Sequence, residues 1–230
     1  MAPKTSEAGG MSRILTVLAV LLGIFAPLVM FVERNIESFY VFRTDELHEL
    51  AKRSIETHGN NTAAIVNAIV TELAENHPLH VNAHHPKNPD EWFLNNAGGA
   101  MGGVYVIHAS ITEYIIIFGT SVGTEGHTGR HTADDYFHIL TGEQWAYAPG
   151  DYEPEVYVPG SVHHLHRGAV KQYKMPEGCF ALEYARGWIP PMLFFGFADG
   201  LSSTLDVPTL WRTAYLTGRE MLGNLALGKF

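Results

Sequence analysis

The stretch TEYIIIFGTSVGTEGHTGRHTADDYFHI, residues 112–139, decides the fold that we predict for this chain. It opens as a strand, because Tyr114, Ile116 and Phe118 fall on one face while the residues between them fall on the other. Glycines then break it into a loop. That loop carries His127, Arg130, His131, Asp134 and Asp135 within nine positions. A rigid strand leading into such a loop is typical of a functional site, although a hairpin with a solvated turn gives the same pattern.

Composition and charge narrow the class of protein. Of its 230 residues, 46 % are hydrophobic and 17 % charged, which suits one domain together with membrane-facing parts. A net charge of −9 leaves no basic stripe to neutralise phosphates, so we expect no nucleic-acid partner. The single cysteine, Cys179, excludes a disulfide framework and a cysteine-based zinc site within one chain.

An uncharged apolar run near the N-terminus predicts a membrane anchor. After a polar segment, residues 1–13, the run Ile14–Val32 has 19 residues without a charge. As a helix it would reach roughly 28 Å, close to the hydrocarbon thickness of a bilayer at about 30 Å. A signal peptide is the alternative, but its apolar region is normally about 7–15 residues long and ends in a small-residue cleavage site. We therefore predict a retained single-span helix over 14–32, whose flanking charges are too balanced to orient it.

The body of the chain is predicted to be α+β. Residues 33–103 are predicted to be a helical region with a connecting loop, because apolar residues recur at helical spacing from Thr44 and again over Thr62–Asn76. From residue 104 to residue 187 the apolar period is two, and glycine and proline turns separate short strands. The predicted strands are Val104–Ala109, Glu113–Phe118, Glu155–Val158, Ser161–Lys174 and Cys179–Arg186. Such a series predicts a small barrel or a jelly roll.

A second apolar region, residues 188–230, closes the chain. Its pattern predicts two helices, about Met192–Ser203 and Thr209–Leu227. Charged residues interrupt both, so neither has the roughly 18 unbroken apolar residues of a membrane span. Such helices either lie on a membrane or cover the mouth of the barrel, with ordinary core helices as the alternative.

Two patterns within the strand region point to possible chemistry. His164 and His166 lie on one face of a predicted strand, as two metal ligands must. No third ligand follows on that strand, since position 170 is Val170, so we predict no metal. Glu183 shares its strand face only with small residues. This arrangement either leaves the acid in solvent, which the pattern alone favours, or leaves room for a ligand beside it.

Several motifs, taken together, identify a family. They are His108-Ala109-Ser110, Thr112-Glu113-Tyr114, Phe118-Gly119-Thr120, Gly126-His127-Thr128-Gly129-Arg130 and Glu183-Tyr184-Ala185-Arg186-Gly187-Trp188-Ile189-Pro190. In this combination the chain resembles the fungal sterol C-8 isomerase family, whose animal relative is the non-opioid sigma receptor. The resemblance covers nearly the whole chain.

The resemblance implies a fold and a cellular location. The fold would be one N-terminal membrane helix, a cupin-like β-barrel over 104–187, and two membrane-associated helices over 188–230 that cover the barrel. Family members are usually trimers in the endoplasmic reticulum membrane. The cupin likeness would account for the two histidines of one strand, since the family binds no metal.

The resemblance also implies an activity and its partners. The fungal members move the sterol double bond from C8–C9 to C7–C8 in ergosterol synthesis, with no cofactor. The expected partners are the sterol substrate, cationic amine inhibitors that mimic the carbocation, and membrane lipid. The alternative from the receptor branch is a membrane protein that binds cationic amines or sterols without turnover.

This reaction needs two acids in an apolar pocket. A proton is delivered at C9, a cation forms at C8, and a proton leaves C7. Burial, or a second carboxylate nearby, keeps the donor protonated by raising its pKa. Glu183 matches the family's ligand-binding glutamate. The receptors' aspartate falls, in an ungapped alignment, at Phe137, so the second acid is Asp135 or Asp134, with Asp135 slightly ahead and His131 as a third option.

The resemblance further implies an apolar wall for the substrate. The predicted substrate-binding residues are Val104, Tyr114, Ile116, Phe118, His131, Leu193 and Gly196. The rings of Tyr114 and Phe118 would also suit a cation. Glu113 and Arg130 are predicted to be structural anchors, through a buried charge or through hydrogen bonds.

Overall fold

The computed structural model of the chain describes residues 7–230, with side chains from Arg13 onward except at Leu22. By its internal contacts the chain divides into two compact units, Met1–Phe39 and Tyr40–Phe230, which are described separately.

The first unit consists of helix α1 (Glu7–Arg34) and the 3-10 turn η1 (Ile36–Phe39). By length and composition, the part Arg13–Arg34 can cross a membrane, in agreement with the span predicted over 14–32. Helix α1 begins at Glu7, so it includes residues 7–13 of the predicted polar segment 1–13. Residues 1–6 of that segment lie outside the described part of the chain.

The second unit has two antiparallel sheets. The six-stranded sheet runs in the order β1-β2-β3-β10-β5-β8, and the four-stranded sheet in the order β4-β9-β6-β7. The first sheet contains β1 (Trp92–Ala97), β2 (Ala100–Ala109), β3 (Glu113–Thr120), β10 (Cys179–Gly187), β5 (Ala133–Thr141) and β8 (Val162–Leu165). The second contains β4 (Thr124–His127), β9 (Gln172–Met175), β6 (Gln144–Tyr147) and β7 (Glu155–Tyr157). These sheets confirm the α+β class. The first strand begins at Trp92, before the predicted start of the strand region at residue 104 and within the predicted helical region 33–103.

Several strands differ from the prediction. The loop predicted after Gly119 ends at β5, which lies between β10 and β8 and therefore has both its edges paired. The consecutive acids Asp134 and Asp135 hide the period of two in the sequence, although burial in the structure does alternate from Ala133 to Tyr136. The single strand predicted over Ser161–Lys174 is two strands, β8 and β9, separated by a turn in which Gly168 has a φ of +78°.

Helices α2 (Thr44–His58) and α3 (Thr62–Asn76) pack on one face of the larger sheet. The Asn61 side chain caps α3 by accepting a hydrogen bond from the Ala64 N–H. Alternate residues of β3, Ile115 and Ile117, face these helices and are fully buried with them. Their neighbours Tyr114, Ile116 and Phe118 belong to a second core on the opposite face, so β3 is buried on both sides.

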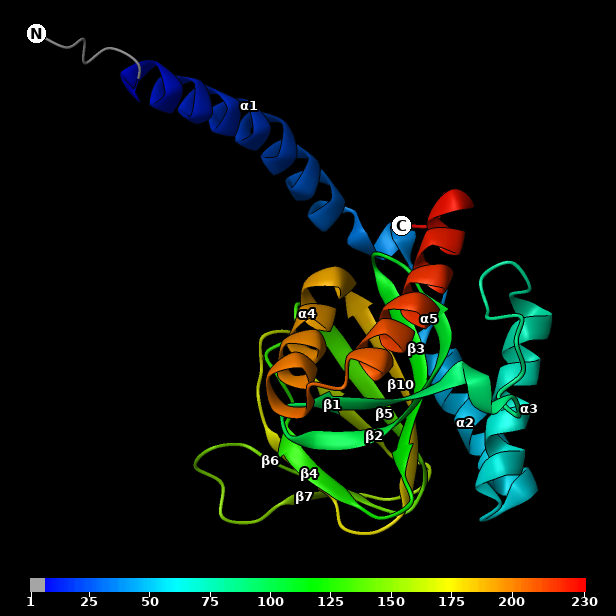
Figure 1. The fold of residues 1–230 in the computed structure, drawn as a ribbon. Helices are drawn as coiled ribbons and strands as arrows, with labels where there is room; N and C mark the ends of the chain where they lie inside the picture. The colour runs from blue at the N-terminus through cyan, green and yellow to red at the C-terminus, as the bar shows by residue number, and fades with distance from the viewer. Residues whose placement is uncertain (1–6) are drawn as a thin grey trace, which may run out of the picture. The chain divides into compact units, whose positions relative to one another are not determined.

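The C-terminal helices cover the other side of the same sheet. They are α4 (Ile189–Asp199), the π-turn η3 (Gly200–Thr204) and α5 (Val207–Ala226), close to the predicted pair. Both helices contact β1, and α5 also contacts β2 (Figure 1). The second core, which contains Met192 and Leu216 of these helices, also contains Met175 from the smaller sheet. The side chains of this second core thus lie in the space enclosed by the two sheets and by the helices α4 and α5.

A tight turn connects β1 to β2, as its glycines predict. Gly98 and Gly99 have φ angles of +67° and +84°. A Cβ atom on Gly126 would lie only 2.4 Å from the Gly98 carbonyl oxygen, so the two backbones approach closely. The His127 N–H donates to that carbonyl at 2.8 Å and fixes β4 against the hairpin.

Candidate active site

A cavity opens between the inner face of the six-stranded sheet and the helices α4 and α5. Its walls are mostly apolar, with contributions from β1, β2, β3, β5, β9 and β10. The cavity and its open mouth hold about 1190 Å³ of space free of protein atoms.

Two acids from neighbouring strands, Asp135 on β5 and Glu183 on β10, line this cavity. In the register of the two strands Glu183 is opposite Phe137, and Asp135 is opposite Ala185. The two acids are therefore diagonal neighbours on one face of the sheet, which lets long side chains meet. The small side chain of Ala185 leaves the space between them open.

Burial dominates the electrostatics of this pair. Asp135 is fully buried, and neither of its carboxyl oxygens accepts a hydrogen bond from an N–H or hydroxyl of the described residues. Burial raises the pKa of Asp135. Burial also raises the pKa of Glu183, and the negative charge of Asp135 raises it further. Each carboxyl group alters the pKa of the other, so the two acids titrate as one pair.

The neighbouring acid, Asp134, lies outside the cavity. Successive residues of a strand face opposite sides, so Asp134 is on the outer face of the sheet with its side chain 34 % exposed. Its Oδ1 lies 2.9 Å from His164 Nε2 and accepts a hydrogen bond from the Arg167 N–H at 3.3 Å. The structure therefore brings Asp135, and not Asp134, into the cavity with Glu183.

The cavity contains every predicted wall residue. These are Val104, Tyr114, Ile116, Phe118, His131, Leu193 and Gly196. Leu193 and Gly196 come from α4, and the strands supply Val104, Tyr114, Ile116 and Phe118. His131 follows the β4 strand in a short loop, where burial lowers its pKa and leaves a neutral ring. Its Nδ1 has no hydrogen-bond partner among the described residues.

The sequence patterns missed other residues of the cavity. The clearest is Tyr173 of β9, a strand of the smaller sheet, whose pKa is raised by burial and then by the charges of Glu183 and Asp135. Gly168 interrupts the predicted strand Ser161–Lys174. This glycine was the signal that could have placed Tyr173 on a separate strand. Others missed are Phe93, Asn95, Thr128, Phe137 and Phe195.

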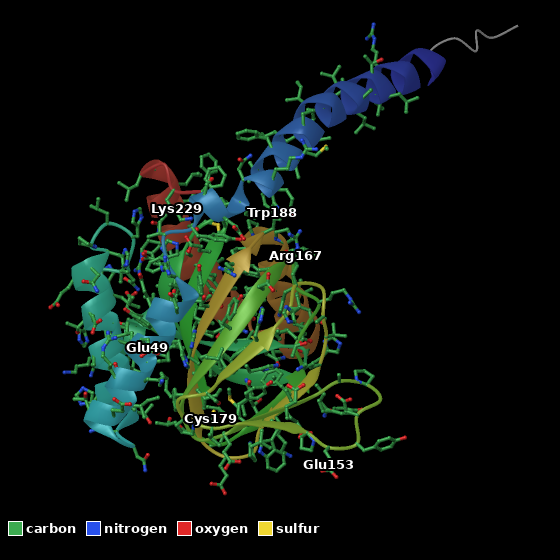
Figure 2. The ribbon with its side chains drawn as sticks, turned by 180° about the vertical axis from the view of Figure 1, so that it is seen from behind. Glu49, Glu153, Arg167, Cys179, Trp188 and Lys229 are labelled. Carbon is green, nitrogen blue, oxygen red and sulfur yellow. The ribbon has the colours of Figure 1, made fainter. Side chains whose placement is uncertain are left out.

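Glu113 anchors the fold behind the cavity, as predicted. Its side chain is 0 % exposed, and it accepts hydrogen bonds from the N–H groups of Val41 and Phe42 at 2.7 and 3.0 Å. The Tyr184 hydroxyl donates to it at 2.7 Å, and Lys229 Nζ lies 2.8 Å from its Oε2. Lys229 is labelled at the C-terminal end of the chain in Figure 2. One buried carboxylate therefore joins the N-terminal part of the second unit, the sheet and the C-terminus.

Arg130 also has the predicted anchoring role. Its guanidinium donates a hydrogen bond to the Gly168 carbonyl oxygen. The loop after β4 is thereby joined to the turn between β8 and β9, and Arg130 does not line the cavity.

The arrangement at Asp135 and Glu183 is suited to proton transfer. Two carboxyl groups that share one proton in an apolar site provide a protonated acid and a carboxylate at once, near neutral pH. The acid can donate to an uncharged substrate, and the carboxylate can stabilise a developing cation or accept a proton.

Comparison with known proteins gives a family match. Residues 19–229 match the family model described as "ERG2 and Sigma1 receptor like protein". A C-8 sterol isomerase from Pyricularia oryzae is 69 % identical over 219 residues, which cover 95 % of this chain and 98 % of that protein. Sigma non-opioid intracellular receptor 1 from Xenopus tropicalis is 37 % identical over 80 % of each chain.

Solved structures give a weaker likeness. An RmlC-like cupin from Shewanella frigidimarina matches with a TM-score of 0.39 and 11 % identity, over 50 % of this chain and 98 % of that one. A likeness at this level carries no argument about the fold. The architecture of the strand region is given by its own strand order and register.

Proposed function

The chain belongs to the ERG2 and Sigma1 receptor like protein family as a sterol C-8 isomerase, and we propose that Asp135 and Glu183 are its proton-transferring pair. The reaction shifts a sterol double bond from C8–C9 to C7–C8. The observation that carries the proposal is the position of the two acids, side by side in an apolar cavity, where burial raises the pKa of both.

The reaction requires one proton in and one proton out. Glu183 holds the shared proton and donates it to C9, which places the positive charge on C8. The carboxylate of Asp135, buried beside it, stabilises this cation more strongly than water could. Loss of a proton from C7 to a carboxylate of the pair then forms the new double bond. Atoms and electrons balance without an oxidant or a reductant.

The cavity wall contributes to binding and to charge stabilisation. The rings of Tyr114 and Phe118 lie in the wall beside the acids, and aromatic faces attract cations. Tyr114 is positioned through its hydroxyl, 3.5 Å from Thr217 Oγ1 on α5. An amine that carries its charge near the place of C8 would pair with the same carboxylate. We therefore include cationic amines among the ligands of this site.

Replacing Asp135 by asparagine is expected to lower turnover about 10²-fold, the lower range for a lost acid–base group. Replacing Asp134 by asparagine is expected to leave turnover near that of the parent, because its side chain lies on the outer face of the sheet. The assay follows conversion of a Δ8-sterol to a Δ7-sterol in heavy water by membranes containing the protein. The Δ7-product should carry deuterium at C9.

This assay separates the two branches of the family. Binding of a sterol or amine without Δ7-product from the parent would contradict the proposed function and favour a receptor without turnover. Equal losses in both aspartate variants, or a larger loss with Asp134→Asn, would contradict the assignment to Asp135 while leaving the enzyme in place.

The pH dependence of kcat/KM is expected to be bell-shaped. Activity falls as the pH drops, because Asp135 then also becomes protonated, and it falls as the pH rises, because the shared proton is lost. Since both pKa values are raised, the alkaline limb should lie well above the ordinary carboxyl pKa of about 4. The residual activity of Asp135→Asn should lack the acidic limb. A flat profile from roughly pH 5 to pH 9 would contradict a shared-proton pair.

We also propose that the protein is a single-pass membrane protein of the endoplasmic reticulum, with α1 as its anchor and α4 and α5 on the membrane surface. Exposed apolar side chains along these C-terminal helices and along η3 and the residues that join them support surface association. Five of them are Phe194, Leu201, Leu205, Val207 and Trp211, which are 55–74 % exposed. We further propose a trimeric assembly, from the family resemblance, and a division of the chain after residues 13, 32 and 187, from the sequence pattern. The division predicted after residue 103 moves back to residue 91, because β1 and the first residues of β2 belong to the six-stranded sheet.

A further inference from the structure

A cluster of two histidines and one aspartate lies on the outer face of the six-stranded sheet, away from the cavity. The members are Asp134 of β5, His164 of β8, and His166, which directly follows β8. Arg167, the next residue, is labelled at this corner of the molecule in Figure 2. The sterol chemistry proposed above does not involve the two histidines.

Strand pairing brings the three side chains together. Tyr136 is paired with His164 and Asp135 with Leu165, so Asp134 is level with the position just beyond β8, at His166. Residues two apart on a strand face the same side. Their neighbours Asp135 and Leu165 are therefore turned inward and buried. Since β8 is an edge strand of its sheet, the cluster is open to solvent on one side.

The distances within the cluster approach those of a metal site. One potential ligand atom from each residue lies within 4.8 Å of the others. Asp134 Oδ1 is 2.9 Å from His164 Nε2 and 3.7 Å from His166 Nδ1. A tetrahedral zinc site with bonds of about 2.0 Å needs ligand atoms roughly 3.3 Å apart. Small side-chain rotations would therefore reach the required geometry.

One ligand is already held in place. The His164 ring stacks on Tyr136 with their centroids 4.1 Å apart and an interplanar angle of 12°. The Tyr136 hydroxyl in turn accepts a hydrogen bond from the Arg186 guanidinium at 3.1 Å. His166, whose side chain is 75 % exposed, is free to complete the site and leaves a path for an ion. Fixing one ligand lowers the entropy cost of binding.

We propose that Asp134, His164 and His166 form a binding site for a divalent transition metal, with Zn²⁺ as the preferred ion. Two imidazoles and one carboxylate are a ligand set that suits Zn²⁺, whereas Ca²⁺ and Mg²⁺ prefer oxygen ligands alone. Water fills the remaining positions of the coordination shell. The sequence and the family resemblance both argued against a metal. The sequence did so because His164 and His166 have no third ligand on their own strand, but β5 supplies that ligand from the neighbouring strand.

The bound ion would join the edge strand to the strand that carries Asp135. It bridges β8 and β5 at the residue next to Asp135, so its binding stabilises the folded state and this part of the sheet. The site is distinct from the cavity, and its existence does not depend on the sterol isomerase mechanism.

Metal titration of the purified full-length protein in detergent tests this proposal. After treatment with a chelator, Co²⁺ is added as a visible probe and then displaced by Zn²⁺. We expect one equivalent of Co²⁺ to give a d–d absorption band, and Zn²⁺ to abolish the band. His166→Ala and Asp134→Asn should each weaken Zn²⁺ binding at least about 10-fold. His164→Phe should do the same while keeping an aromatic ring against Tyr136.

The control is His85→Ala, which removes an exposed histidine elsewhere and should bind Zn²⁺ as the parent does. A second measurement is the melting temperature, which Zn²⁺ should raise for the parent and for His85→Ala but not for His166→Ala. Absence of stoichiometric binding by the parent would overturn the proposal. Unchanged affinity and melting behaviour in His166→Ala and Asp134→Asn would place the ion elsewhere and overturn it as well.

Discussion

Replacing Glu183 by glutamine is expected to lower turnover about 10³–10⁴-fold, at the upper range for removal of a general acid. Glutamine keeps the size of the side chain but holds no proton that it can transfer to C9. The measurement is formation of Δ7-sterol, with deuterium at C9, from a Δ8-sterol in heavy water. Parent and variant are compared at equal amounts of folded protein.

The fold is expected to survive this change. Because burial raises the pKa of Glu183, the folded protein keeps its proton at pH values where the unfolded chain has lost it. The contribution of Glu183 to the parent's stability is therefore full below the ordinary glutamate pKa and is lost as the pH rises through the folded-state pKa. Glutamine removes this loss, so the variant should unfold at the same or a higher temperature near neutral pH.

One outcome for Glu183→Gln would contradict the assignment of Glu183 as the proton donor. Equal amounts of deuterated product from parent and variant would keep the enzyme but exclude an essential role for Glu183. Loss of product together with a lower melting temperature would contradict the expectation that the neutral side chain is tolerated in the cavity.

Replacing Glu113 by glutamine is expected to destabilise the second unit by about 3–5 kcal/mol, the usual cost of breaking a buried ion pair. The amide has one acceptor oxygen instead of two, so one N–H of Val41 or Phe42 loses its partner. Lys229, only 5 % exposed, loses its ion pair with Glu113. For a unit of this size the melting temperature should fall by roughly 6–20 °C.

Two milder variants serve as controls for Glu113→Gln. Tyr184→Phe removes one hydrogen bond to Glu113 and should cost about 1.5–3 kcal/mol, as for a bond to a charged group. Lys229→Met breaks the same ion pair but leaves the backbone hydrogen bonds of the carboxylate, so it should cost no more than Glu113→Gln. Thermal unfolding in detergent, followed by tryptophan fluorescence, measures all three. A change in melting temperature no larger than that of Tyr184→Phe would contradict the central role of Glu113.

Local sequence patterns were enough to predict elements whose burial, on one face or on both, shows in the spacing of their apolar residues. The short apolar run from Tyr114 to Phe118 gives β3, and the helical spacing over Thr62–Asn76 gives α3 with the same ends as in the structure. The strand is predicted because it is buried on both faces and is therefore apolar throughout, and the helix because burial on one side imposes its own period.

Local patterns were insufficient where neighbours from distant parts of the chain decide the environment. Glu183 alternates with bulky residues, and its pattern alone favoured solvent, whereas the cover of α4 and α5 makes its side of the sheet a cavity. The loop predicted at Asp134 and Asp135 is the strand β5, because β10 and β8 satisfy both its edges.

The sequence by itself determined that α1 is long and apolar enough to cross a membrane, the α+β class and the family, and the family resemblance predicted Glu183 as a ligand-binding acid. The tertiary structure alone decided which aspartate joins it. Adjacent strand residues face opposite sides, so only pairing with β10 shows that Asp135 faces the cavity and Asp134 the outer surface. The pairing of β5 with β8 brings Asp134 to His164, a contact across 30 residues of sequence. Spacing along one strand cannot reveal such a contact, because strand pairing creates it.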